Sequence, residues 1–79
     1  MGSVEQGDRV RVFVGTWVRR GIFPAGEPKQ ARNTYVVRVE NVVRQPPALH
    51  DVAEWLVRGD VYWCWLKDVR PLVKASDDG

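Results

Sequence analysis

Apolar and polar residues alternate in two stretches of the chain, and this period of two is typical of a strand with one buried face. Residues 9–14 have the sequence Arg-Val-Arg-Val-Phe-Val and follow a Gly-Asp pair that suits a turn. Residues 35–43 begin with Tyr-Val-Val-Arg-Val, and Gln45-Pro46-Pro47 follows them. We therefore predict one strand in each stretch, and inward positions for Val10, Val12 and Val14 in the first.

Between these strands, residues 15–33 show no regular period. Glycine or proline occurs at positions 15, 21, 24, 26 and 28, which is too often for a helix. We predict a long first loop, with room for a short strand around residues 17–23. Because compact domains rarely hold an unstructured loop longer than about 12–15 residues, this one is either held in place by Trp17, Ile22 and Phe23 or used for binding.

Residues 48–58 fit two structures. Their apolar residues have the spacing of a short amphipathic helix. In contrast, Gly59-Asp60 between stretches of aromatic and β-branched residues resembles the two-residue loop of a type II′ hairpin. We favour a hairpin with arms at 54–58 and 61–66, and leave open a single helical turn after Pro47. Residues 66–72 then close the domain, with a short 3₁₀ turn before Pro71.

The hairpin register sorts the side chains into two faces. With a loop at Gly59-Asp60, Trp55 lies opposite Cys64 and Leu56 lies opposite Trp63. One face then lacks charge, and we predict that it faces the core; it carries Trp55, Val57, Tyr62, Cys64 and Leu66. The other face mixes aromatic and charged residues; it carries Glu54, Leu56, Arg58, Val61, Trp63, Trp65 and Lys67.

Two interpretations of this second face stay open. In the first, Trp63 and Trp65 are exposed and form a partner-binding surface with Arg58 and Lys67, since aromatic residues and arginine are typical interface anchors. In the second, the 15–33 loop folds over the two tryptophans and makes a second small core.

The length of 79 residues allows one domain. We place it at residues 7–72, between a flexible N-terminus at 1–6 and a frayed tail at 73–79. No apolar stretch is long enough for a membrane span, and the N-terminus lacks a secretory pattern, which indicates a cytoplasmic protein. One cysteine and one histidine exclude a disulfide framework and the usual zinc sites, so we expect no metal and no cofactor.

Four to five short strands without a sustained helix favour closure into a small barrel, which removes exposed sheet edges. Gly7-Asp8-Arg9-Val10, Gly15-Thr16-Trp17, Thr34-Tyr35-Val36-Val37 and a closing Leu66-to-Pro71 segment follow one another in the order seen in Tudor and Agenet domains. The chain thus resembles these SH3-like barrels over most of its length. The resemblance implies an all-β fold and, at Trp17 and Tyr35, positions similar to aromatic residues that surround a methylated ammonium. The chain lacks the acidic residues expected around such a cage.

The charge distribution suggests a second kind of partner. Between Gly7 and Ser76, twelve cationic residues face seven acidic ones, which leaves a net charge of +5. A basic stripe with aromatic platforms is typical of small barrels that bind nucleic acid. We place Arg9, Arg11, Arg19, Arg20 and Arg38 in this stripe.

The residues offer little for catalysis. His50 and Asp51 are sequence neighbours whose side chains do not point together, and Cys64 is expected in the core. One enzyme alternative comes from the type II dihydrofolate reductases, whose opening strand is similar to residues 7–11, although Val61-Tyr62-Trp63-Cys64 replaces their active strand. We favour a non-catalytic module for protein–protein recognition or self-association, with nucleic-acid binding as the alternative.

Overall fold

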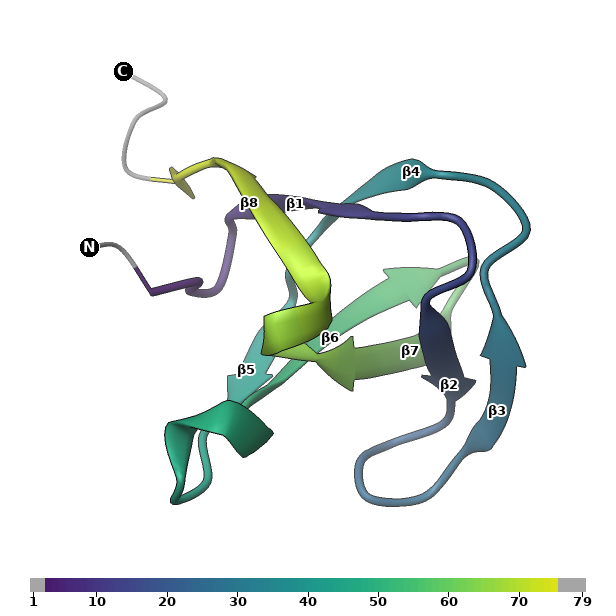
Figure 1. Ribbon diagram of the computed structural model, residues 1–79, viewed down its shortest axis with the longest axis horizontal. Coiled ribbons are helices and arrows are strands. Elements are labelled where there is room, and N and C mark those ends of the chain that lie inside the picture. The colour runs from purple at the N-terminus through teal and green to yellow at the C-terminus, as the bar shows by residue number, and fades with distance from the viewer. Residues whose placement is uncertain (1–2, 76–79) are drawn as a thin grey trace.

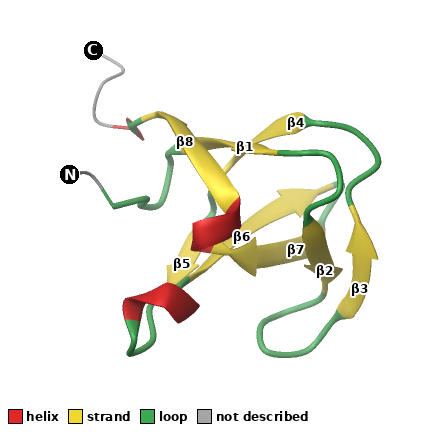
Figure 2. Cartoon of the chain, viewed as in Figure 1, coloured by secondary structure: helices red, strands yellow, loops and turns green. Residues whose placement is uncertain are grey.

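Eight short strands form two antiparallel sheets in the computed structural model of the chain, which describes residues 3–75 (Figures 1 and 2). The predicted all-β fold is confirmed, but four to five strands was too few. One sheet has the order β4-β1-β8 and the other the order β3-β2-β7-β6-β5. The strands are β1 (Arg9–Val12), β2 (Trp17–Arg20), β3 (Glu27–Gln30), β4 (Tyr35–Arg38), β5 (Asn41–Val43), β6 (Val52–Val57), β7 (Asp60–Trp65) and β8 (Val69–Val73).

The opening strand β1 lies at the centre of the three-stranded sheet, between β4 and the closing strand β8. Its alternation works as the sequence predicted. Val10 and Val12 are fully buried, whereas Arg9 and Arg11 lie on the opposite face. Val14 is the exception among the expected inward positions, because β1 ends at Val12 and Val14 is exposed.

The predicted strand at 35–43 is divided between the two sheets. The backbone hydrogen bonds of Val39 and Glu40 join different sheets. Val39 N donates to Asp8 O, next to β1, at 2.7 Å, and Glu40 N donates to Glu54 O in β6 at 2.7 Å. The chain therefore leaves β1 after β4 and joins β6 as β5. Val39, at this crossing point, is fully buried.

The predicted long loop at 15–33 is a hairpin of β2 and β3. The short strand expected around Trp17 is confirmed, and the sequence analysis missed its partner β3, whose four residues are all exposed on the edge of the sheet. Residues 21–26 connect the two strands as a turn, and residues 15–16 and 31–33 lie outside them at either end of the hairpin. Gly26 has φ +136°, and a Cβ there would lie 2.9 Å from Arg20 O, so this turn requires glycine.

The register of the β6–β7 hairpin differs from the prediction. Val57 pairs with Asp60, so the turn is Arg58-Gly59, with φ values of 52° and 87°. Two positive φ values define a type I′ turn, and the predicted II′ turn at Gly59-Asp60 is wrong. The change moves the pairing by two positions in total, which preserves the faces. Trp55 thus keeps its place on the core side, opposite Tyr62. The core position predicted for Val57 is wrong: it lies at the end of β6 beside the turn and is 41% exposed.

The hairpin favoured for residues 48–58 is confirmed, as is the single helical turn left open after Pro47, whereas the amphipathic helix considered for this segment is not formed. Ala48–His50 forms one 3₁₀ turn, and β6 begins at Val52. A second 3₁₀ turn at Leu66–Asp68 precedes β8, as predicted. None of the helical segments within residues 3–75 is long and apolar enough to cross a membrane.

The core lies between the two sheets and extends beyond the predicted domain of 7–72. Val4 is 6% exposed and packs into the main core cluster, although residues 1–6 were expected to be flexible. Val73 belongs to β8, although the tail was expected to start there. The remaining predictions for residues 1–2 and 76–79 lie outside the described residues.

Candidate functional site

The turn at residues 21–26 covers Trp63. This tryptophan is 4% exposed, its Nε1 donates to Ala25 O at 2.9 Å, and Phe23 packs edge-on against it at 4.8 Å between ring centroids. Arg19 lies over the same ring, with its guanidinium carbon 5.8 Å from the centroid. The exposed position expected for Trp63 is wrong, and the alternative of a second small core is confirmed for this residue.

Trp65 is half-buried beside this small core. Its ring lies 6.2 Å from Phe23 and 5.7 Å from both Trp63 and His50. The flanking cations expected to share its surface are both exposed: Arg58 lies in the hairpin turn, and Lys67 pairs with Asp68 at 3.3 Å. Arg58 is therefore at the opposite end of β7 from Trp65.

Trp17 and Tyr35 are not brought together. Trp17 alternates with Val18, and because Val18 is buried, Trp17 lies on the outer side of β2 with 59% of its surface exposed. It lines a shallow hollow with residues 14–16 and Asp68. Tyr35 lies on the inner side of β4 and lines a different cavity. The arrangement that would surround a methylated ammonium is thus not formed by this pair.

Four arginines lie side by side on the outer face of the three-stranded sheet. Arg9 and Arg11 are two positions apart in β1 and share this face. Arg9 pairs with Arg38 of β4, and Arg11 pairs with Arg70 of β8. Residues that face each other directly across two strands lie on the same side of the sheet. We call this set, Arg9, Arg11, Arg38 and Arg70, the arginine face.

Acidic residues neutralise little of the arginine face. Glu40 lies 3.7 Å from Arg38, at an exposed site where such a pair is weak. Among residues 3–75, no carboxylate lies within 4.0 Å of Arg9, Arg11 or Arg70. The two cross-strand pairs of like charge disfavour the isolated sheet. An anion bound between them would remove this repulsion.

An aromatic residue lies at the β8 side of the arginine face. Phe13 directly follows β1 and is 42% exposed. It lines a hollow of about 600 Å³ with Arg70, Lys67 and Asp68, the carboxylate that pairs with Lys67. An exposed ring beside cations is a platform on which a nucleic-acid base can stack.

The two other arginines predicted for the basic stripe lie on the five-stranded sheet. Arg19 covers Trp63 and donates from Nη1 to Gly26 O at 3.2 Å. Arg20 lies 3.7 Å from Glu27. Their places in β2 separate them from the arginine face, because β2 pairs with β3 and β7 and has no partner in the other sheet. Of the five arginines predicted for the stripe, the structure thus brings together Arg9, Arg11 and Arg38.

An apolar cavity of about 320 Å³ lies between the β2–β3 and β6–β7 hairpins. Tyr35, Trp55 and Tyr62 supply three aromatic walls, and the rim includes Lys29 and Arg32. Burial raises the pKa of Tyr35, and the neighbouring Cys64 and Tyr62 raise it further, so its hydroxyl stays neutral at physiological pH. The predicted core face of the hairpin already joined Trp55 with Tyr62. Tyr35 was not connected to them, because it lies in β4 of the other sheet.

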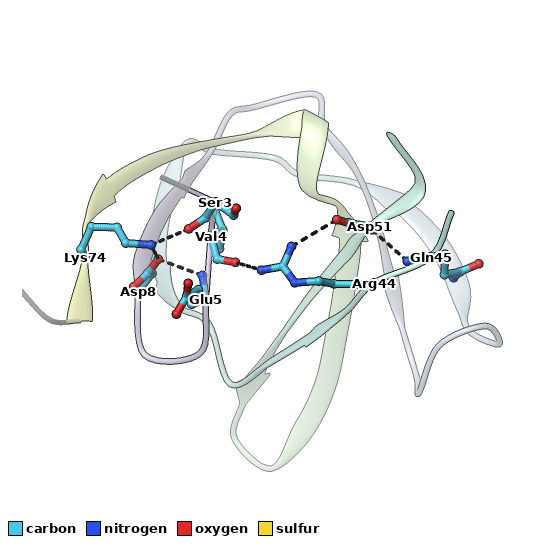
Figure 3. A network of polar contacts seen from close by, with 8 residues as sticks. All are labelled: Ser3, Val4, Glu5, Asp8, Arg44, Gln45, Asp51 and Lys74. Atoms are coloured by element: carbon cyan, nitrogen blue, oxygen red, sulfur yellow. Dashed lines mark hydrogen bonds and ion pairs between the residues drawn. The ribbon is translucent and has the colours of Figure 1, made fainter. Parts of the chain in front are cut away.

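Two buried carboxylates fasten the chain ends to the sheets (Figure 3). Asp8 accepts from Lys74 Nζ at 2.7 Å, Ala75 N at 2.8 Å and Glu5 N at 2.9 Å. Burial alone would raise the pKa of Asp8, but these hydrogen bonds and the lysine charge outweigh it, so its pKa lies below the ordinary value. The network thus holds the end of β8 against the start of β1.

Asp51 plays a matching part on the other side of the same network. It accepts from Arg44 Nη1 at 3.2 Å and from Gln45 N at 2.8 Å, and Arg44 Nη2 donates to Val4 O at 2.7 Å. Asp51 is 7% exposed. Since all four carboxylate oxygens of Asp8 and Asp51 accept hydrogen bonds from the chain, we assign the network to stability and not to a binding site.

The two side chains with the greatest potential for catalysis, Cys64 and His50, do not form a reactive site. Cys64 is buried, and desolvation, with a smaller effect of Asp68, raises the pKa of its thiol to about 12. A thiol in this state is unreactive at neutral pH. His50 contacts Trp65, and no group of three His, Cys, Asp or Glu residues within 3–75 is arranged to hold a metal ion.

Comparison of the chain with known protein families, curated proteins and solved structures gave no match.

Proposed function

We propose that the chain is a non-catalytic binding module whose arginine face binds the phosphate backbone of a single-stranded nucleic acid. The observation that carries the proposal is the alignment of Arg9, Arg11 and Arg70 with no carboxylate of residues 3–75 within 4.0 Å. Guanidinium groups bind phosphate in a forked geometry, which suits such an array. Phe13 then provides a stacking platform beside the phosphates, which favours a strand with unpaired bases.

For the fold we propose an SH3-like barrel of the Tudor and Agenet kind. The pairing of the closing strand β8 with the opening strand β1 supports this proposal, because it joins the two ends of the domain in one sheet. The order of the short sequence motifs supports it independently. In such a barrel the arginine face lies on the outer surface and does not contribute to the core.

Fluorescence anisotropy with a labelled single-stranded oligonucleotide tests the function. The Phe13→Ala variant should bind about 5- to 150-fold more weakly, the loss expected when a base no longer stacks on a ring. Phe13→Leu is the matched control, because it keeps an apolar side chain of similar size without the ring; it should bind as weakly as the alanine variant. Wild-type binding by both variants would contradict the role of Phe13, and absence of binding by the wild-type chain at low salt would overturn the proposal.

Protein–protein recognition, or self-association, is a second candidate. The observation that favours it is the exposed apolar surface near the hairpin end, where Leu56 is 52% and Ile22 is 70% exposed. Apolar side chains of this size are anchors in many interfaces. Light scattering coupled to size exclusion tests it: a dimer that persists at high salt and is lost in Leu56→Ser supports this candidate, and a monomer at all concentrations contradicts self-association.

A further inference from the structure

The cavity between the two hairpins has walls that suit a flat ligand. Tyr35 of β4, Trp55 of β6 and Tyr62 of β7 line it, and Val18 and Ala31 complete its apolar lining. Aromatic walls favour planar ring systems, because offset or edge-on ring contacts add to the apolar contact. Its volume of about 320 Å³ is at the lower end of the range of small-molecule sites.

The rim of the cavity is positively charged. Lys29 and Arg32 line it, and no aspartate or glutamate contributes to the lining. Neither cation has a carboxylate partner within 4.0 Å among residues 3–75. The charge is therefore complementary to an anion and repels an ammonium group. This feature separates the cavity from a cage for methylated lysine.

The indole N–H of Trp55 is a buried donor without an acceptor. Trp55 is 1% exposed, and its Nε1 has no hydrogen-bond partner among the described residues. Buried donors in folded proteins are almost always paired. Because Nε1 has under 1 Å² of accessible surface, an acceptor on a ligand in the cavity would reach it only when the Trp55 ring shifts on binding. A pure hydrocarbon ring would leave the donor unpaired, whereas a heteroaromatic base carries ring and carbonyl acceptors.

We propose that this cavity binds a single nucleotide, with its base among the three aromatic rings and its phosphate at Lys29 and Arg32. The base supplies the acceptor for Trp55 Nε1, and the side-chain amide of Asn33 at the rim can pair with a further edge of the base. The inference goes beyond the binding of a nucleic-acid backbone, because the cavity and the arginine face share no residue.

Three probes separate the parts of this proposal in ¹H–¹⁵N NMR titrations of the full chain. Uridine 5′-monophosphate has both base and phosphate, uridine lacks the phosphate, and phenyl phosphate has a ring without an acceptor. We expect the monophosphate to bind about tenfold or more tightly than either partial probe, and to move the indole N–H resonance of Trp55. Equal binding of all three probes, or a monophosphate that leaves this resonance unchanged, would overturn the proposal.

Charge variants test the position of the phosphate. Lys29→Gln with Arg32→Gln should weaken monophosphate binding to the level of uridine and leave uridine binding unchanged. Arg20→Gln with Arg58→Gln is the matched control, since it removes the same charge from residues outside both the cavity lining and the arginine face and should leave monophosphate binding unchanged. Equal weakening in both double variants would mean that the phosphate is held by net charge alone, which contradicts the proposed site.

The same titration with a short oligouridylate distinguishes the source of the nucleotide. Equal affinity per binding site for the monophosphate and the oligomer at the cavity identifies a free nucleotide as the ligand. Tighter binding of the oligomer, with the Trp55 resonance still moving, identifies a nucleotide within a chain. Binding of the oligomer that moves only resonances of the arginine face would exclude the cavity and overturn the inference.

Discussion

The outer faces of the two sheets differ in composition and in exposure: one carries an aromatic residue that the chain covers, and the other carries arginines that stay exposed. On the five-stranded sheet, Trp63 is covered by the 21–26 turn, through the ring of Phe23 and the carbonyl of Ala25. On the three-stranded sheet, Arg9 and Arg38 face each other and both are exposed. A polar–apolar alternation therefore identifies the two faces of a sheet, but it does not decide which face the rest of the chain will cover.

The difference follows from desolvation. Covering a tryptophan removes a large apolar surface from water, which is favourable, and the one polar atom of its ring finds an acceptor in Ala25 O. Covering unpaired guanidinium groups would cost free energy, because each would lose its hydration without gaining a partner. The covered face thus contributes to stability, and we expect the uncovered face to act in binding.

The largest effect should come from removing the covered ring. Trp63→Ala would leave a cavity under Phe23 and should lower the free energy of unfolding by about 3–5 kcal/mol, as measured by urea denaturation. Trp17→Ala is the matched control, because Trp17 is 59% exposed and its loss should change stability by less than about 0.5 kcal/mol. Equal effects of the two substitutions would contradict the assignment of a second core.

A smaller effect is expected where β8 is fastened to the uncovered sheet. Asp8→Ala would leave the Ala75 and Glu5 amides and Lys74 without their buried acceptor, and should lower the free energy of unfolding by about 1–3 kcal/mol. The substitution should also weaken nucleic-acid binding, since Arg70 is carried by β8. Unchanged hydrogen exchange in β8 of the Asp8→Ala variant would contradict this fastening role.

The contribution of Asp8 should depend on pH in a definite direction. Its pKa is lower in the folded chain than in the unfolded chain, so the unfolded state takes up the proton first as the pH falls. The stability from Asp8 is thus fully present at neutral pH and is lost as the pH falls below the ordinary aspartate range. Denaturation curves of the wild type and Asp8→Asn should converge in acid, and a constant difference between them would contradict the shift.

The smallest effect on stability should come from the arginine face. Arg70→Gln relieves the like-charge pair with Arg11 and should raise the free energy of unfolding by about 0.5 kcal/mol at low salt. High salt should remove this gain by screening. Arg70→Lys is the control that keeps the charge and should show no gain. A clear loss of stability in Arg70→Gln would show that the arginine contributes to folding.

Alternation can predict the strands in which apolar side chains face the core and polar side chains face the solvent. The strand at β1 and the inward positions of Val10 and Val12 followed from alternation. Trp55 kept its predicted core side despite the error in register, because that error was an even number of residues. The turn type could not be predicted, since it depends on Arg58 adopting a positive φ that few side chains adopt. The exposed edge strand β3 was missed because its sequence has no apolar period.

The candidate site was predictable only where it follows one strand. Arg9 and Arg11 share a face of β1 by simple alternation, and Arg38 occupies the same kind of position in β4. Arg70 was missed because its place depends on the long-range pairing of β8 with β1. The rim cations Lys29 and Arg32 lie in a segment that was expected to be a loop, so no pattern connected them to Trp55.

The most direct test of the central claim is the salt dependence of binding to a labelled single-stranded oligonucleotide, measured from roughly 50 to 200 mM salt. Each arginine that contacts a phosphate should contribute about 0.7 to the slope of log affinity against log salt. Arg9→Gln with Arg70→Gln should therefore reduce the slope by about 1.4, whereas Arg20→Gln with Arg58→Gln, which removes equal charge elsewhere, should leave it unchanged. Equal slopes for the two double variants would contradict binding at the arginine face.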